Sequence, residues 1–256
     1  ETITSIEKNA FNDCSSVKNI QWNAITCQID GDPFASSRSQ VTSFSFGDKV
    51  QNIPEHLCYG MNQITSIYIP AGVTNIGKHA FNLCTNIKSI VVDSLNTVYD
   101  SRHNCNAIIL TSDNQLYLGC QSTNIPNSIR TIGTGAFQGC VGLKSITIPD
   151  SVTNIQNSAF TGCTSLSTIT IPKNVEHIGE NTFDGCSALT NIKWNVKQLC
   201  DTCNDWSDSY WYGGWDGPEY YGYEIRTLFS DISKQITSFT FGDSVIYIPA
   251  GLCYGM

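Results

Sequence analysis

A 23-residue repeat limits this chain to a small set of folds. Three copies align without gaps, at residues 129–149, 152–172 and 175–195. Each copy has a cysteine at the same place, with apolar residues at fixed distances before and after it. Repeats of roughly 20–50 residues are typical of solenoids. One coil cannot bury its own apolar face, whereas stacked coils bury a continuous one. The sequence therefore predicts a repeat solenoid.

Weaker copies extend the same frame over most of the chain. The cysteine position is filled by Cys14, Cys84, Cys140, Cys163 and Cys186, and by Met61 and Met256 in two variant copies. Eight residues earlier stand Ile6, Ile53, Ile76, Ile132, Ile155, Ile178 and Ile248. We expect these isoleucines to lie on top of one another in a dry interior. We also expect one stacked column of phenylalanines, formed by Phe11, Phe81, Phe137, Phe160 and Phe183.

Each copy also predicts its strands. In LKSITIP (143–149), apolar and polar residues alternate with a period of two, which indicates a half-buried strand ended by Pro149. A shorter β-branched stretch such as VTNI (152–155) follows, and then a compact turn. The expected fold is a right-handed coil, mostly β with short turns and 3-10 segments, with a parallel strand ladder on one face.

The pattern resembles that of the BspA-like leucine-rich repeats, whose 23-residue unit reads AFxxCxxLxxIxIPxSVxxIG. The residues that carry the resemblance lie between 129 and 195, and two further stretches, 40–61 and 98–129, are similar to that family. The resemblance implies a solenoid at the extracellular surface of a bacterium, in some cases an adhesin. It implies no enzyme activity and no cofactor.

Three insertions interrupt the repeat, near residues 23–40, 93–128 and 196–235. The central one reads as a strand followed by a hairpin, with AIIL (107–110) and LYL (116–118) on either side of a turn at Asp113–Asn114. The first and third insertions share a Trp-Asn pair and a following strand. We expect one solenoid over residues 1–256 without independent domains. Because no capping repeat is recognisable, we expect it to be part of a longer protein.

The third insertion holds the segment that most resembles a binding site. It is acidic and rich in aromatic residues, which include Trp206, Tyr210, Trp211, Tyr212, Trp215, Tyr220, Tyr221 and Tyr223. Such side chains stack on sugar rings or anchor a protein partner. The alternative is an irregular insert that packs its own aromatic rings against the solenoid. Its carboxylates have no calcium-loop spacing, so no metal site is predicted.

The outward positions of the long strands form the usual binding face of a solenoid. Here they are mostly Thr, Ser, Asn and Lys, and only Tyr68 is a residue type typical of a binding hot spot. The alternative is a plain solvated sheet surface.

The chain has 12 cysteines, but most of them occupy repeat positions. This placement favours buried thiols that pack as small apolar groups over disulfides. Cys105 and Cys120 flank the predicted hairpin, which leaves a bridge between them open. Cys200 and Cys203 form a lone CxxC, a weak signal for zinc or redox chemistry.

Charge and motifs exclude several function classes. The net charge of −8 argues against nucleic-acid binding, and no apolar run is long enough to span a membrane. The motifs of serine hydrolases, zinc proteases and nucleotide-binding enzymes are missing, so we assign no catalytic residue.

The sequence thus leads to three functional hypotheses. The first is a non-catalytic adhesion or binding module on the cell surface that recognises a host or surface protein or a glycan, and we expect it to be monomeric. The second is a spacer that displays another domain. The third and least favoured is an enzyme that acts on carbohydrate.

Overall fold

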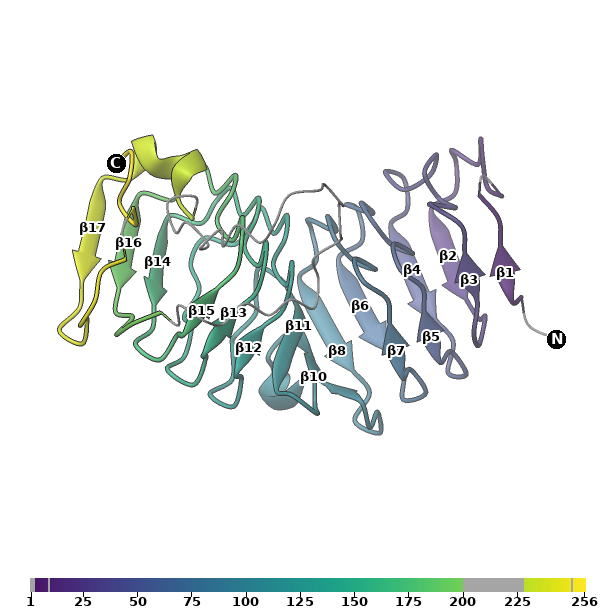
Figure 1. The fold of residues 1–256 in the computed structure, drawn as a ribbon. Coiled ribbons are helices and arrows are strands. Elements are labelled where there is room, and N and C mark those ends of the chain that lie inside the picture. Colours follow the sequence, from purple (N-terminus) through teal and green to yellow (C-terminus); the bar gives the residue numbers. More distant parts are fainter. Residues whose placement is uncertain (1–2, 9, 200–227, 250) are drawn as a thin grey trace, which may run out of the picture.

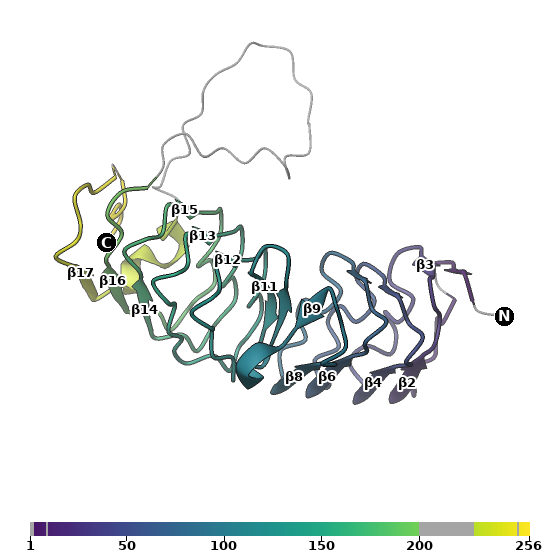
Figure 2. The ribbon, with the colours of Figure 1, turned by 90° about the horizontal axis from the view of Figure 1, so that it is seen from below.

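The chain forms a curved β-solenoid of about eight turns with almost no helix (Figure 1). The computed structural model describes residues 3–8, 10–199, 228–249 and 251–256. A full coil carries one four-residue strand and one two-residue strand. The four-residue strands line one side of the solenoid and the two-residue strands the other (Figure 2).

The strands follow the repeat closely. The four-residue strands are β2 (Asn19–Trp22), β4 (Ser43–Phe46), β6 (Ser66–Ile69), β8 (Ser89–Val92), β14 (Thr168–Ile171), β16 (Asn191–Trp194) and β17 (Ser238–Phe241). The two-residue strands in the coils are β1 (Ser5–Ile6), β3 (Gln28–Ile29), β5 (Asn52–Ile53), β7 (Asn75–Ile76), β12 (Thr131–Ile132), β13 (Asn154–Ile155) and β15 (His177–Ile178). The central insertion adds β9 (Tyr99–Asp100), the 3-10 helix η1 (Arg102–Asn104), β10 (Ala107–Leu110) and β11 (Gln115–Gly119), and a second 3-10 helix, η4 (Ser230–Gln235), precedes β17.

The isoleucine positions stack as the repeat predicts, except that Ile248 in the last coil is 50% exposed and does not lie in the dry interior. In parallel register, Ile132 pairs with Ile155, and Ile155 pairs with Ile178. All three side chains are buried in one hydrophobic cluster. At the other end Ile6 pairs with Ile29, so the first insertion contains a further residue of this column that the sequence alignment missed. This in-register stacking confirms the solenoid.

The long strands other than β17 alternate between more exposed and more buried residues, which confirms the half-buried strand prediction. In β6, Ser66 and Tyr68 face outward, while Ile67 and Ile69 are buried. Residues 143–149 are an exception, because the structure assigns no strand there. The segment keeps the alternation, but its bonding to the following coil begins with a 3.2 Å bond from the Ser167 N–H to the Lys144 carbonyl and does not continue as a ladder.

The central insertion forms the predicted hairpin, with β10 antiparallel to β11 and Asn114 in a left-handed turn conformation (φ 50°). Strand β11 also pairs in parallel with β12, so the hairpin extends the short-strand sheet. Side chains of β10 enter two separate hydrophobic clusters. Ile108 belongs to the N-terminal one, and its neighbour Ile109 to the C-terminal one. The hairpin therefore acts as a wall between two cores, with both of its faces buried.

Two tyrosines close the gap between this wall and the N-terminal coils. The Ile76 N–H donates to the Tyr99 hydroxyl at 3.1 Å, and the Tyr117 hydroxyl donates to the Gly77 carbonyl at 2.8 Å. Burial raises the pKa of both phenols. Backbone groups at the edge of β7 are thus satisfied without a neighbouring strand.

The prediction of one phenylalanine column is wrong, because the column is broken. The rings of Phe137, Phe160 and Phe183 stack, with centroids 5.2 and 5.7 Å apart, and Phe229 from the third insertion extends the stack at 5.3 Å. Phe11 instead stacks on Phe34 from the first insertion, at 5.0 Å.

Two features separate these stacks. Cys58 occupies the phenylalanine position between Phe34 and Phe81, and Phe81 packs edge-on against Phe46. The hairpin then intervenes before Phe137, whose ring lies directly against Gly119.

The first and third insertions share an architecture, as their common sequence predicts. Trp22 pairs with Phe46 and Trp194 pairs with Phe241, each at the end of neighbouring long strands. The aromatic packing behind them matches as well. The rings of Phe34 and Phe44 lie edge-on, with centroids 6.2 Å apart and an interplanar angle of 80°. The equivalent rings of Phe229 and Phe239 have centroids 6.0 Å apart and an interplanar angle of 81°.

We predict that Gly119→Ala lowers the free energy of unfolding by about 1–3 kcal/mol, because the new methyl group would overlap ring atoms of the buried Phe137. Urea unfolding followed by circular dichroism measures the change. Gly142→Ala is the matched control, since its methyl group meets only the end of the flexible Gln121 side chain and should cost less than about 0.5 kcal/mol. Equal stability of the two variants would contradict the close packing of Phe137 on Gly119.

Candidate functional site

Most of the predicted site residues lie outside the part of the chain that the structure describes. These are the aromatic residues of the third insertion, Trp206, Tyr210, Trp211, Tyr212, Trp215, Tyr220 and Tyr221. Their role therefore stays a prediction. Tyr68, the remaining predicted site residue, is described and provides the starting point for the site.

Tyr68 stands on the outward face of β6 with 48% of its surface exposed. Its register partner on β8 is Val91, which is 45% exposed, and Leu95 just beyond β8 is 78% exposed. Three large side chains with exposed apolar surface thus lie on two neighbouring coils, on a face that is otherwise mainly Ser and Thr. Single exposed apolar residues need no explanation, but a contiguous group is typical of an interaction surface.

Asp93 holds this group together. The Tyr68 hydroxyl donates to Asp93 Oδ2 at 2.5 Å, and the Leu95 N–H donates to Asp93 Oδ1 at 2.8 Å. The hydrogen bond from Tyr68, and then that from Leu95, lowers the pKa of Asp93, because both stabilise the carboxylate. The bond to Asp93 in turn raises the pKa of Tyr68, with smaller effects of desolvation and of the negative charges of Asp93 and Asp48. At neutral pH the pair is therefore a fixed carboxylate beside a neutral phenol.

The long-strand ladder stops beside this group. The Val92 N–H donates to Ser101 Oγ at 3.0 Å, and the Ile90 N–H donates to Asn106 Oδ1 at 3.5 Å. These side-chain oxygens accept hydrogen bonds from the N–H groups that a following strand would otherwise have bonded. The loop between them contains His103 and Asn104 in left-handed conformations, which are unfavourable for residues other than glycine.

Arg102 fixes the position of this loop. Its guanidinium donates to both carboxylate oxygens of Asp100, from Nε at 2.9 Å to Oδ1 and from Nη2 at 2.6 Å to Oδ2. A third bond of 2.9 Å reaches Asn114 Oδ1 at the tip of the hairpin. A two-pronged pair of this kind restrains geometry more than a single contact does.

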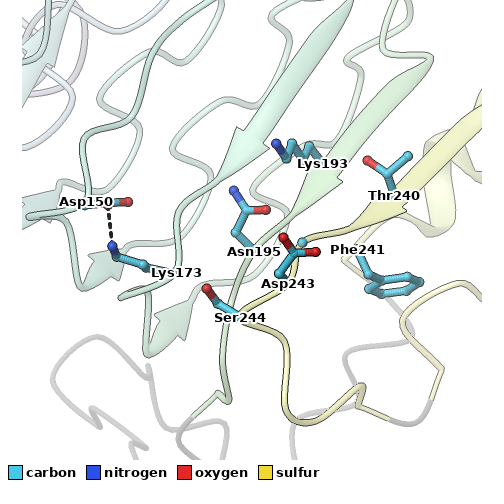
Figure 3. Close-up of a pocket in the computed structure, with 9 residues that line it drawn as sticks. Asp150, Lys173, Lys193, Asn195, Thr240, Phe241, Asp243 and Ser244 are labelled. Carbon is cyan, nitrogen blue, oxygen red and sulfur yellow. Dashed lines mark ion pairs between the residues drawn. The ribbon is translucent and has the colours of Figure 1, made fainter.

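A second candidate surface is a shallow hollow of about 540 Å³ beyond the ends of β14, β16 and β17 (Figure 3). It is lined by Asp150, Lys173, Lys193, Asn195, Thr240, Phe241, Gly242, Asp243 and Ser244. Lys173 and Asp150 form an ion pair at 3.1 Å.

The chemistry of this hollow suits a polar ligand, since it offers ammonium, carboxylate, amide and hydroxyl groups. In Figure 3 the Phe241 ring points away from Asn195 and Asp243, so the hollow presents no stacking platform to a sugar. The sequence analysis did not identify it. The sequence signal that could have located the hollow is the Trp-Asn pair shared by the two ends of the chain. Asn195 of one pair lies against Gly242, just as Asn23 of the other lies against Gly47.

The cysteines on the repeat ladder are free thiols with a specific hydrogen bond. In consecutive coils, the Cys163 thiol donates to the Phe137 carbonyl and the Cys186 thiol to the Phe160 carbonyl, both at 3.2 Å. The Cys84 thiol donates to the carbonyl of Cys58, again at the phenylalanine position of the preceding coil. Every cysteine of the described chain is free, Cys105 and Cys120 included, and the CxxC of 200–203 lies outside it.

Burial makes the ladder thiols unreactive. Desolvation raises the pKa of Cys84, Cys140 and Cys186 to about 12, and that of Cys163 further still. The two terminal coils differ from the prediction of buried thiols, because Cys14 is only half-buried and Cys253 is exposed. In these two coils, the cysteine side chain is not covered by neighbouring coils on both sides.

We predict that iodoacetamide at pH 8 labels Cys14 and Cys253 of the folded protein and leaves Cys84, Cys140 and Cys186 unmodified. A thiol with a pKa of about 12 is ionised in only about one molecule in 10⁴ at that pH, and it is also shielded. Peptide mass spectrometry gives the modified fraction at each site. Labelling in denaturant is the control and should reach all of them, whereas fast labelling of Cys140 in the native protein would contradict the packed ladder.

Among the residues that the structure describes, no three His, Cys, Asp or Glu side chains come together as a metal site would require. The helices of that part of the chain are also too short and too polar to cross a membrane.

Solved structures with the same fold come from bacteria. A leucine-rich repeat protein from Eubacterium ventriosum is 24% identical with a TM-score of 0.61, and the alignment covers 76% of this chain and 58% of that one. The pneumococcal vaccine antigen PcpA is 20% identical with a TM-score of 0.54, with coverage of 77% and 57%. This chain therefore spans less than two thirds of either protein. A leucine-rich cell surface protein from Faecalibacterium prausnitzii is 21% identical with a TM-score of 0.49, with coverage of 94% and 79%.

Among curated proteins, none matches the chain. The model of the BspA type leucine-rich repeat region, however, matches residues 1–108 and 114–204 in six copies. That match covers well over half of the sequence and rests on the same repeat that forms the coils. The chain belongs to the BspA type leucine-rich repeat family.

Proposed function

We propose that this protein is a non-catalytic adhesion or binding module on the surface of a bacterial cell, and that it recognises a host or surface protein or a glycan. The observation that carries the proposal is that the residues used for packing and the large exposed residues lie at different places along the chain. In the inner coils, the apolar residues that define the repeat are buried, whereas the exposed residues Tyr68, Val91 and Leu95 lie at an interruption of the ladder. Interruptions of a solenoid are where binding residues are usually found.

The aromatic insert at 206–223 is the second part of the proposal. Trp211 and Trp215 supply large contact area with little rotamer entropy to lose, as binding hot spots require. Membership of a family of bacterial surface proteins supports an extracellular location. We further propose that residues 1–256 form one solenoid without independent domains, since the two hydrophobic clusters share the β10–β11 hairpin.

We predict that replacing Trp211 and Trp215 by alanine lowers binding to a glycan and matrix-protein array by at least about tenfold, while thermal unfolding is nearly unchanged. Hot-spot aromatic residues typically contribute this much or more to binding. The control is Tyr254→Ala, an exposed aromatic residue of the last coil that should leave binding intact. Parallel loss of folding and binding would instead indicate that the insert packs on the solenoid.

A spacer function is the second candidate, favoured by the outward faces of β4 and β14, which carry only Ser and Thr. A spacer should bind nothing on the same array, and its function should depend on the number of coils. Deletion of residues 152–174, one whole repeat, would then impair display of an attached domain, whereas a binding module would retain its ligand.

A further inference from the structure

The group around Tyr68 has a chemistry of its own. We define the Tyr68 patch as the exposed side chains of Tyr68, Val91 and Leu95 together with the carboxylates of Asp48 and Asp93. Tyr68 and Val91 are adjacent on the paired strands β6 and β8, and Leu95 follows β8 directly. The patch therefore combines one aromatic ring, two branched aliphatic side chains and two negative charges.

The two carboxylates come from coils on either side of the ring. Asp93 is fixed by the Tyr68 hydroxyl and the Leu95 N–H. Asp48 is exposed on the preceding coil, close enough for its charge to act on the Tyr68 phenol. On β8 the exposed lysine, Lys88, precedes the strand, roughly 10 Å along the chain from Val91 at the usual rise per residue. Lys88 is therefore too distant to neutralise the patch. Lys49, also exposed, follows Asp48 directly and offsets its charge, so the negative potential beside the Tyr68 ring rests on Asp93.

An aromatic face beside a fixed carboxylate attracts a cation, because the ring quadrupole and the negative charge act in the same direction. Val91 and Leu95 add an apolar surface that can cover the methylene stem of a long basic side chain. A saccharide could stack on the Tyr68 ring and bond to Asp93, but it would leave Val91 and Leu95 without a matching partner surface, since branched aliphatic side chains offer neither a flat stacking surface nor hydrogen bonds.

We propose that the Tyr68 patch receives a lysine or arginine side chain, flanked by an apolar residue, from a protein partner. The proposal deepens the proposed binding function and rests on it, because it assigns the chemical class of partner for one surface. The net charge of −8 favours the approach of such a basic segment from a distance. Tyr68 and Asp93 bind the cation, while Val91 and Leu95 contact the apolar neighbour.

The probe is a capped pentapeptide, Gly-Leu-Arg-Leu-Gly, titrated into the whole chain while the methyl NMR signals of Val91 and Leu95 are followed. Citrulline and norleucine versions of the peptide remove the charge. We expect the arginine peptide to bind best, and its Kd to rise when salt increases from about 20 mM to about 300 mM. Tyr68→Ala and Asp93→Asn should each weaken binding about 3- to 10-fold, with unfolding temperatures unchanged.

Matched controls separate the patch from exposure or charge alone. Tyr247→Ala removes a tyrosine that is 47% exposed in the last coil, and Asp113→Asn removes a carboxylate at the hairpin tip. Both should leave the Kd unchanged. Equal binding of the citrulline peptide, an equal loss in Tyr247→Ala, or no binding at about 10 mM peptide would each overturn the proposal.

Array binding of glycans that depends on Tyr68 would also overturn it, by assigning the surface to a saccharide. The peptide titration and the array are independent. If the array binds nothing while the peptide binds as expected, the adhesion function fails and the patch chemistry stands. If the peptide fails while Trp211 and Trp215 still control array binding, only the patch proposal falls.

Discussion

The structure depends on one contact, the in-register stacking of identical apolar side chains from successive coils. Each short strand is only two residues long, so its backbone bonds alone would not hold a coil in place. The register Ile132–Ile155–Ile178 works because each isoleucine covers the one before it and is covered by the next. The same rule applies to the ring stack Phe137–Phe160–Phe183, whose planes differ by only 7° and 1°. A solenoid of this kind is stable through neighbours and has no single central core.

Interruptions must therefore replace what a missing neighbour would have supplied. The central insertion, which comprises β9 and the β10–β11 hairpin, does so on both sides. Tyr99 and Tyr117 bond the backbone at the edge of β7, and Gly119 leaves room for the first ring of the C-terminal phenylalanine stack. On the long-strand face, the side-chain oxygens of Ser101 and Asn106 accept hydrogen bonds from backbone N–H groups of β8. An edge protected in this way cannot extend by adding another strand, which confines partner recognition on this face to side chains.

Much of the fold could be predicted because the repeat determines which side chains are buried. The isoleucine column, the strand alternation and the hairpin all follow from residue spacing. The broken phenylalanine column was not predicted, although Phe34 lies one period after Phe11 and Phe229 lies two periods after Phe183, because the residues around Phe34 and Phe229 do not repeat the AFxxC pattern. Residues 143–149 illustrate the same limit. Their pattern indicates a strand, but a ladder also needs a neighbour at bonding distance, and the preceding coil there is the irregular central insertion. For the site, sequence pattern identified Tyr68 as the outward aromatic residue, but it could not place Asp93 and Leu95 beside it.

The packing also explains why the candidate site has few reactive groups to offer. The thiols of Cys163 and Cys186 donate to carbonyls of the preceding coil, and burial raises the pKa of Cys186 to about 12. Threonine hydroxyls next to the two-residue strands donate to neighbouring backbone, as those of Thr74 and Thr153 do. What remains on the surface is contact area and charge. A rigid array of this type holds exposed groups such as Tyr68 and Asp93 in fixed positions before a partner arrives, so little ordering is needed on binding. Preorganised recognition by a few side chains is therefore the chemistry for which this architecture is best suited.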